Sequence, residues 1–247
     1  MKKMNMPEEL YRYYSLDENF DSIFKKGELW FSSPKDFNDP FDFRVINHND
    51  YEISDIISFV SRNGENNPIE ANIFAQAVIE KSSYFNQKVN KVINKRLSNK
   101  LVCCFTTKSD NLLMWSHYAD KHRGVCLKFS PRLDSNLFTK LYAVEYSKNS
   151  GNYDFINKME ESFNKVITLK SIDWSYEEEF RVVKYDQERG QKFNKNALKE
   201  VVFGCESTSD EIERIMKLAF DNGFHHVNFK MAKQKKLEFG LEFESIK

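Results

Sequence analysis

The residues best suited to chemistry lie in one short run, Tyr176–Arg181 (YEEEFR). In a β-strand, successive side chains point to opposite faces, so Glu177, Glu179 and Arg181 are predicted to share one face. Two carboxylates about 7 Å apart repel each other unless a cation or a polar ligand relieves them. Arg181 could do so as a structural ion pair. We interpret the run as the best candidate for a working site, with Glu177 and Glu179 as candidate catalytic carboxylates.

A second candidate is Arg12, which lies among tyrosines, including Tyr13, in the apolar segment ELYRYY. An arginine on a strand can act as a fixed fork for phosphate or carboxylate. The alternative is a structural ion pair with Asp39 or Asp42. The sequence supports the two interpretations equally.

A third cluster begins with Ser32 and Ser33, at the end of the second expected strand, and leads into Asn38-Asp39-Pro40. Taken alone, these residue types are typical of turns. They become candidates for substrate binding only in combination with the other clusters.

The fourth segment is Met114–Asp120 (MWSHYAD). Trp115, His117 and Tyr118 could stack on and hydrogen-bond to a base or a sugar. For Trp115, an anchor in the hydrophobic core is the slightly preferred interpretation.

Period-two and helical patterns predict the elements that position these residues. The chain is predicted to be one α+β domain over residues 1–247, with mixed or antiparallel sheets and a helical insertion at 50–99. Strands are expected at 9–14, 29–33, 101–106, 124–130, 141–146, 177–185, 198–203, 227–231 and 237–243. Helices are expected at 18–26, 111–120, 153–169 and from a capping box at Thr208 and Glu211 to Gly223.

Composition narrows the function classes. With 37 basic and 37 acidic residues, the chain lacks the excess of positive charge typical of a general nucleic-acid coat, although residues 88–100 form a local basic stretch. No GxGxxG, P-loop or HExxH motif is present, and we expect no metal site. No run of about 18 apolar residues is present, so no membrane span is expected. Four cysteines in apolar runs predict reduced core thiols and a cytoplasmic protein.

Four segments together resemble a known bacterial family, domain of unknown function 2971. They are LYRYYSLD (10–17), LWFSSPKDFNDPFD (29–42), CFTTKSDNLLMWSHYADKHRGVCLKF (104–129) and WSYEEEFRVV (174–183). The resemblance spans nearly the whole chain outside the helical insertion. It implies kinship, and no activity.

The chain also resembles ADP-ribosyltransferase-like domains, which place an Arg or His on the first strand, a Ser, Thr or Tyr on the second, and a Glu on a later strand. Arg12, Ser32 or Ser33, and Glu179 follow that order, and Glu177 with Glu179 resembles the paired glutamates of arginine-directed members. The resemblance implies NAD as substrate, with Arg12 holding the dinucleotide and aromatic residues enclosing the nicotinamide.

The function predicted from these resemblances is NAD-dependent ADP-ribosyl transfer or NAD hydrolysis, in an effector for defence against phage. The acceptor would be nucleic acid or protein. One alternative is a nucleotide- or nucleic-acid-binding sensor module without catalysis. Another is a magnesium-dependent nuclease that uses Asp39, Asp42, Glu177 and Glu179.

Overall fold

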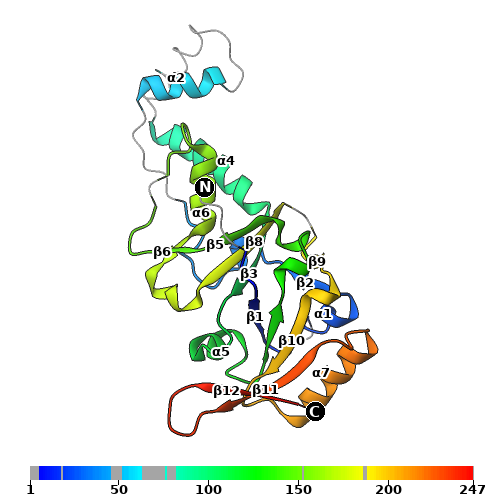
Figure 1. Ribbon diagram of the computed structural model, residues 1–247. Helices are drawn as coiled ribbons and strands as arrows, with labels where there is room; N and C mark the ends of the chain where they lie inside the picture. The colour runs from blue at the N-terminus through cyan, green and yellow to red at the C-terminus, as the bar shows by residue number, and fades with distance from the viewer. Residues whose placement is uncertain are drawn as a thin grey trace. The chain divides into compact units, whose positions relative to one another are not determined.

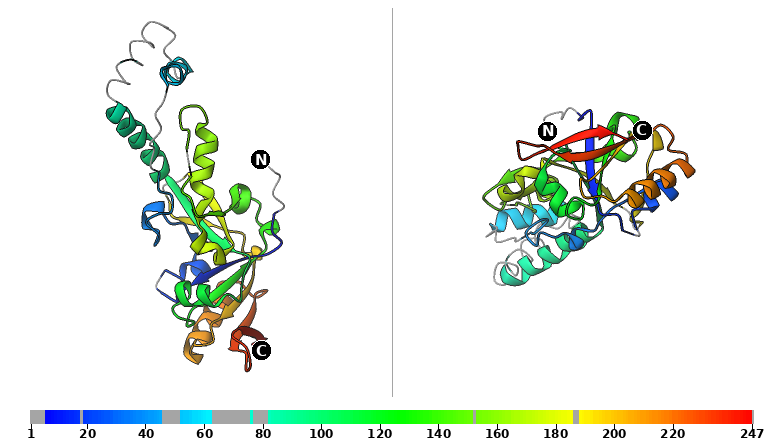
Figure 2. Two further views of the ribbon diagram at one scale, coloured as in Figure 1. Left: turned by 90° about the vertical axis from the view of Figure 1, so that its left-hand side faces the viewer. Right: turned by 90° about the horizontal axis from the view of Figure 1, so that it is seen from below.

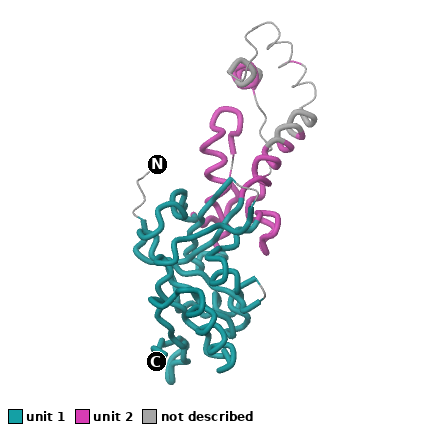
Figure 3. The backbone as a smooth tube through the Cα atoms, turned by 90° about the vertical axis from the view of Figure 1, so that its right-hand side faces the viewer, with its two compact units in different colours: residues 1–32, 101–144, 173–247 teal, residues 33–100, 145–172 magenta. Residues whose placement is uncertain are grey.

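The structure is a computed structural model that describes residues 6–17, 19–45, 52–62, 76, 82–151, 153–185 and 188–246. The chain divides into two compact units (Figure 3). Unit 1 comprises residues 1–32, 101–144 and 173–247, and unit 2 comprises residues 33–100 and 145–172. Within the described ranges, no helix is long and apolar enough to cross a membrane.

Unit 1 is built on an eight-stranded mixed sheet, which is mostly antiparallel and includes a parallel pair, β10 with β11 (Figure 1). The predicted α+β class is therefore confirmed. In sheet order, the strands are β12 (Leu241–Ser245), β11 (Asn228–Gln234), β10 (Leu198–Phe203), β4 (Val125–Phe129), β1 (Leu10–Tyr14), β3 (Lys100–Thr106), β8 (Glu179–Tyr185) and β5 (Leu141–Ala143).

The sheet has two covered faces, which we name after the helices that pack on them. The α7 face carries α1 (Ser22–Lys25) and α7 (Ser209–Asp221), whose apolar residues join a core with Leu10, Cys103 and Leu127. The α5 face carries α5 (Leu112–Tyr118), whose Trp115 packs with Tyr13 and other residues of a second core. Because strand side chains alternate, neighbouring residues on one strand belong to opposite faces.

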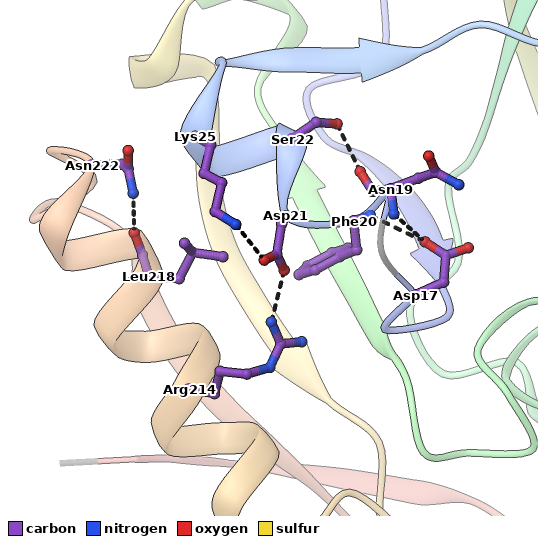
Figure 4. A network of polar contacts seen from close by, with 9 residues as sticks. All are labelled: Asp17, Asn19, Phe20, Asp21, Ser22, Lys25, Arg214, Leu218 and Asn222. Atoms are coloured by element: carbon purple, nitrogen blue, oxygen red, sulfur yellow. Dashed lines mark hydrogen bonds and ion pairs between the residues drawn. The ribbon is translucent and has the colours of Figure 1, made fainter.

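Polar contacts join the two helices of the α7 face (Figure 4). Asp21 accepts from Lys25 Nζ at 2.9 Å and from Arg214 Nη1 of α7 at 2.7 Å. Asp17 caps the turn before α1, where its Oδ1 accepts the backbone N–H groups of Asn19 and Phe20. Helix α7 begins with the predicted capping box, in which Thr208 and Glu211 bond reciprocally.

A short antiparallel ribbon of β2 (Glu28–Trp30) and β9 (Gly190–Lys192) completes the α7 face. Leu29 and Phe31 contribute to its core. Five short 3-10 helices occur among the described elements: η1 (Pro34–Asp36), η2 (Pro131–Leu133), η3 (Leu137–Lys140), η4 (Ile172–Glu177) and η5 (Lys195–Ala197).

Unit 2 is mainly helical. It contains α2 (Ile53–Arg62), α4 (Ser82–Ser98), α6 (Met159–Thr168) and a parallel pair of short strands, β6 (Glu145–Ser147) and β7 (Leu169–Ser171). A buried ion pair, Lys170 with Asp42, lies within it, with 3.9 Å between Nζ and Oδ2. Helices α2 and α4 fall in the predicted insertion at 50–99, but residues 63–75 and 77–81 of that insertion lie outside the described residues.

Several predicted elements are shorter than expected. The strand expected at 237–243 begins only at Leu241, because residues 235–240 form the turn between β11 and β12 (Figure 2). Leu237 and Phe239 therefore stand fully exposed in that turn. The helix expected at 153–169 is confined to α6, and the helix expected at 18–26 is confined to α1.

Candidate functional site

Helix α5 is fixed to the glutamate-rich segment through Asn111, its N-cap. Asn111 Oδ1 accepts the backbone N–H groups of Leu113 and Met114, which satisfies the first turn of the helix. The other side of the same amide donates to the carbonyl of Tyr176 at 3.0 Å. One side chain therefore both starts α5 and holds η4 beside it. Sequence reasoning missed this role, although an asparagine before an apolar run is an N-cap signal.

Glu177 is buried at the end of η4, where it is 3% exposed. Its Oε1 accepts the hydroxyl of Tyr118, the last residue of α5, at 2.6 Å. This short bond to a charged acceptor orients the carboxylate. The prediction that Glu177 lies on a strand is wrong, because β8 begins two residues later, at Glu179.

Glu178 explains why the strand starts late. Its φ of 42° lies in the left-handed region, which is costly for a residue other than glycine. The backbone turn is held by two contacts of the Glu178 carboxylate. Thr107 Oγ1 donates to it at 2.7 Å, and Lys108 Nζ lies 3.4 Å from it. The turn therefore presents Glu177 from a helical segment and Glu179 from a strand.

Glu179 and Arg181 form a buried bidentate pair on one face of β8, as their spacing predicted. Arg181 Nε donates to one carboxylate oxygen at 2.7 Å, and Nη2 donates to the other at 2.9 Å. Arg181 is 0% exposed and Glu179 is 5% exposed. Phe180 and Val182 pack with the α7-face core, so Glu179 and Arg181 point to the α5 face.

The thiol of Cys104 lies close to this pair. Burial raises the pKa of Cys104 well above its ordinary value, and the negative charge of Glu179 raises it further. Cys104 is therefore a neutral neighbour of the carboxylate, not a thiolate nucleophile.

The remaining aromatic candidates of α5 divide between core and surface. Trp115 is fully buried, donates Nε1–H to the carbonyl of Ser109 at 2.9 Å, and meets the Tyr13 ring edge-on at 5.1 Å between centroids. Trp115 and Tyr13 are thus packing residues of the α5 face. His117 is exposed and packs beside Tyr118.

Arg12 lies on the opposite face of the sheet. Its Nη1 donates to Cys103 Sγ at 2.8 Å and to the carbonyl of Cys104, and its Nη2 donates to the carbonyl of Trp30 at 3.2 Å. The side chains of Cys103 and Cys104 alternate across β3, and Glu179 is near the second. The structure therefore does not bring the guanidinium of Arg12 and the carboxylate of Glu179 to one face. The alternation of β1, in which Leu10 shares a face with Arg12, agrees with this placement.

The predicted serines have structural partners. Ser32 forms a β-bridge with Val102 through its backbone N–H and carbonyl, both at 2.9 Å. Ser33, Asn38 and Asp39 belong to unit 2, where Ser33 and Asp39 are buried. Asp39 Oδ1 accepts the N–H of Phe41 at 2.9 Å, as expected for a turn residue.

A separate pocket of 730 Å³ opens beneath the turn between β11 and β12. Its lining includes His122, Cys205 and Phe239, and none of the predicted site residues. His122 ends a run of three residues with positive φ that begins at Asp120. The run is held in part by the bond from the N–H of Glu206 to the carbonyl of His122 at 3.0 Å.

The described residues contain no group of three His, Cys, Asp or Glu side chains placed to hold a metal ion. Of the four carboxylates considered for a nuclease, Asp39 and Asp42 belong to unit 2, while Glu177 and Glu179 belong to unit 1.

Comparison with known protein families gives a match. Residues 114–182 match the model of the family described as protein of unknown function (DUF2971). The match confirms the predicted resemblance to this family over residues 114–182. The DUF2971 match runs from the start of the aromatic segment of α5 to the middle of β8, so it contains Tyr118, Glu177, Glu179 and Arg181. No curated protein and no solved structure matches significantly.

Proposed function

We propose that this chain cleaves NAD, and that Glu177 is the carboxylate that faces the ribose. In this reaction the bond between the ribose and nicotinamide breaks, and its electron pair leaves with nicotinamide. A hydroxyl, an amine or water then bonds to the ribose carbon and loses its proton. The products are nicotinamide and either ADP-ribosylated acceptor or free ADP-ribose.

The observation that carries the proposal is the 2.6 Å bond from Tyr118 to the buried Glu177. The sugar becomes cationic as nicotinamide leaves, so a fixed carboxylate beside it lowers the energy of the transition state. Burial strengthens that interaction, because charges attract more strongly in a medium of low dielectric constant. The hydrogen bond and the strained turn at Glu178 hold the carboxylate before the reaction begins.

Glu179 has a different role in this proposal. Its two oxygens accept hydrogen bonds from Arg181, so the ion pair fixes both side chains in place close to Glu177 in the chain. We assign Glu179 and Arg181 to positioning. Arg12 has no role in the proposed reaction, because its side chain lies on the other face of the sheet.

To test the proposal, the protein is incubated in a lysate with labelled NAD. Nicotinamide release and labelled products are measured in the same sample. Glu177→Gln is expected to abolish both, while the matched variant Glu242→Gln, at an exposed position of strand β12, keeps both. Tyr118→Phe is expected to lower the rate roughly 10- to 100-fold, as one hydrogen bond to a charged group is worth about 1.5–3 kcal/mol.

Glu179→Gln is a poor test of catalysis, because it leaves Arg181 with a neutral partner and weakens folding. Each variant therefore needs a thermal unfolding curve beside its rate. The proposal is wrong if the wild-type chain neither releases nicotinamide nor labels any component. Binding of NAD without turnover would favour the sensor module, and magnesium-dependent cleavage of nucleic acid would favour the nuclease.

A further inference from the structure

Two cations on the α7 face have only neutral partners. Arg12 donates to a thiol and to two backbone carbonyls, and Lys184 Nζ donates to the side-chain oxygen of Gln191 at 3.1 Å. Within the part of the chain that the structure describes, neither cation has a carboxylate at ion-pair distance. Lys184 is partly exposed, but Nε of the Arg12 guanidinium is buried, and a cation partly taken out of water without an opposite charge needs an explanation.

Two buried polar atoms at the same place form no well-aligned hydrogen bond among the described residues, although their side chains interact with each other. They are Nε of Arg12 and the hydroxyl oxygen of Tyr14. The guanidinium lies over the Tyr14 ring, 4.9 Å from its centroid, so the two atoms belong to one cluster. Unsatisfied buried polar atoms are rare in native proteins and often mark an ion or a water.

The two cations contact consecutive residues. Arg12 donates to the carbonyl of Trp30, and Lys184 Nζ lies 5.7 Å from the centroid of the Phe31 ring. Arg12 also donates to the thiol of Cys103, on which the charges of both cations act. Burial raises the pKa of Cys103 to about 11, although the charges of Arg12 and Lys184 both act to lower it. The thiol is therefore neutral near pH 7 and supplies no negative charge to offset the cations. The two cations of this cluster therefore have no negatively charged group beside them among the described residues.

We propose that Arg12 and Lys184 bind a phosphate group of a small ligand on the α7 face. A guanidinium offers a planar fork that matches phosphate oxygens, and an ammonium adds a point charge. This site is distinct from the carboxylates of the α5 face, so it goes beyond the proposed cleavage of NAD and does not depend on it.

The approach to this site runs past Trp30. The Trp30 side chain is 44% exposed, and its carbonyl accepts from Arg12 at 3.2 Å. Lys184 is partly exposed as well. The partly exposed Lys184 ammonium would meet the phosphate first, and an attached base could stack on the exposed Trp30 ring.

The test measures the melting temperature of the full chain against pyrophosphate, with sodium chloride at equal ionic strength as the salt control. Pyrophosphate is expected to raise the melting temperature of the wild type, since a ligand that binds only the native state stabilises it. Lys184→Gln is expected to weaken apparent binding roughly tenfold, because it removes one charged donor. Lys192→Gln, which removes an exposed lysine that already pairs with Glu28 at 3.2 Å, is the matched control and should behave as wild type.

Arg12 variants could fail to fold, so Lys184→Gln carries the test. Tryptophan fluorescence supplies a second readout, with ADP as a further probe, and Trp30→Phe identifies the part of the signal that comes from Trp30 and not from Trp115 or Trp174. Equal affinity for pyrophosphate and ADP indicates recognition of phosphate alone, and tighter binding of ADP indicates a base on Trp30. The proposal is overturned if pyrophosphate acts no more strongly than chloride, or if Lys184→Gln responds as the wild type does.

Discussion

The two faces of the unit 1 sheet carry similar charged groups in opposite states. On the α5 face, Glu179 and Arg181 neutralise each other through two hydrogen bonds, and Glu177 accepts from Tyr118. On the α7 face, Arg12 and Lys184 have only neutral partners. The charged residues are buried on the α5 face and partly buried on the α7 face, and the faces also differ in whether each charge has an opposite charge beside it. This difference underlies our two proposals, which assign fixed catalytic groups to one face and a binding site for an anion to the other.

The largest expected change in stability follows from removing the cation that neutralises Glu179 on the α5 face. Arg181→Met leaves Glu179 buried without its cation, so the free energy of unfolding should fall by about 3–5 kcal/mol. Chemical denaturation measures the change. Arg123→Met, which removes an exposed arginine paired with Asp120, is the matched control and should cost less than about 1 kcal/mol. A similar small cost for Arg181→Met would remove the contrast between the faces.

A smaller effect is expected on the α7 face. Arg12→Met, in buffer without phosphate, removes hydrogen bonds but leaves no buried charge unpaired. Its cost should be about 1–2 kcal/mol, well below that of Arg181→Met. The comparison is made by denaturation under the same conditions. A cost equal to that of Arg181→Met would mean that Arg12 is compensated in a way that its contacts do not explain.

The ion pairs of Asp21, with Lys25 and with Arg214 of α7, show how much partly exposed charges contribute to the free energy of unfolding. Burial acts to raise the pKa of Asp21, but its bonds to Lys25 and Arg214 outweigh burial and lower it overall. The folded state thus holds the charged form more tightly than the unfolded state does. This contribution is complete above the unfolded pKa of about 4 and is lost as the pH falls through the lower folded value.

Asp21→Asn is expected to cost about 1 kcal/mol at pH 7, since exposed pairs contribute little each. Denaturation at pH 7 and again near pH 3 checks both the size and the sign. The difference between wild type and variant should shrink at the lower pH. A difference that grows on acidification would contradict the assignment of the lowered pKa to the ion pairs.

The smallest expected effect is a difference in the alkylation rates of two thiols, one near each face of the sheet. Cys103 is fully buried with a pKa raised to about 11, whereas Cys205 is partly exposed beside the pocket. In the native protein at pH 8, iodoacetamide should label Cys205 well before Cys103, as mass spectrometry can show. Rapid labelling of Cys103 would mean that the cluster around Arg12 opens more readily than its packing indicates.

The sequence predicted those elements whose signals are local. Strand Leu198–Phe203 and the capping box at Thr208 and Glu211 were found where expected, because alternation and capping chemistry depend only on near neighbours. The pairing of Glu179 with Arg181 followed from their spacing of two residues.

Features that depend on distant contacts could not be predicted in this way. The left-handed turn at Glu178 involves no glycine and is held by Thr107 and Lys108, which are far away in the sequence. The meeting of Arg12 with Lys184 around one thiol requires the order β1-β3-β8. The sequence order of Arg12, Ser32 and Glu179 also gave no indication that the sheet would separate the first from the last.

The measurement that most directly tests the separation of roles uses two variants and two readouts on the same purified protein. Nicotinamide release and the pyrophosphate-induced rise in melting temperature are recorded for Glu177→Gln and Lys184→Gln. We predict a crossed result, in which Glu177→Gln loses release but keeps the rise. Lys184→Gln should lose most of the rise but keep release at saturating NAD. If either variant loses both properties while remaining folded, or if the wild type has neither, the assignment of different roles to the two faces is contradicted.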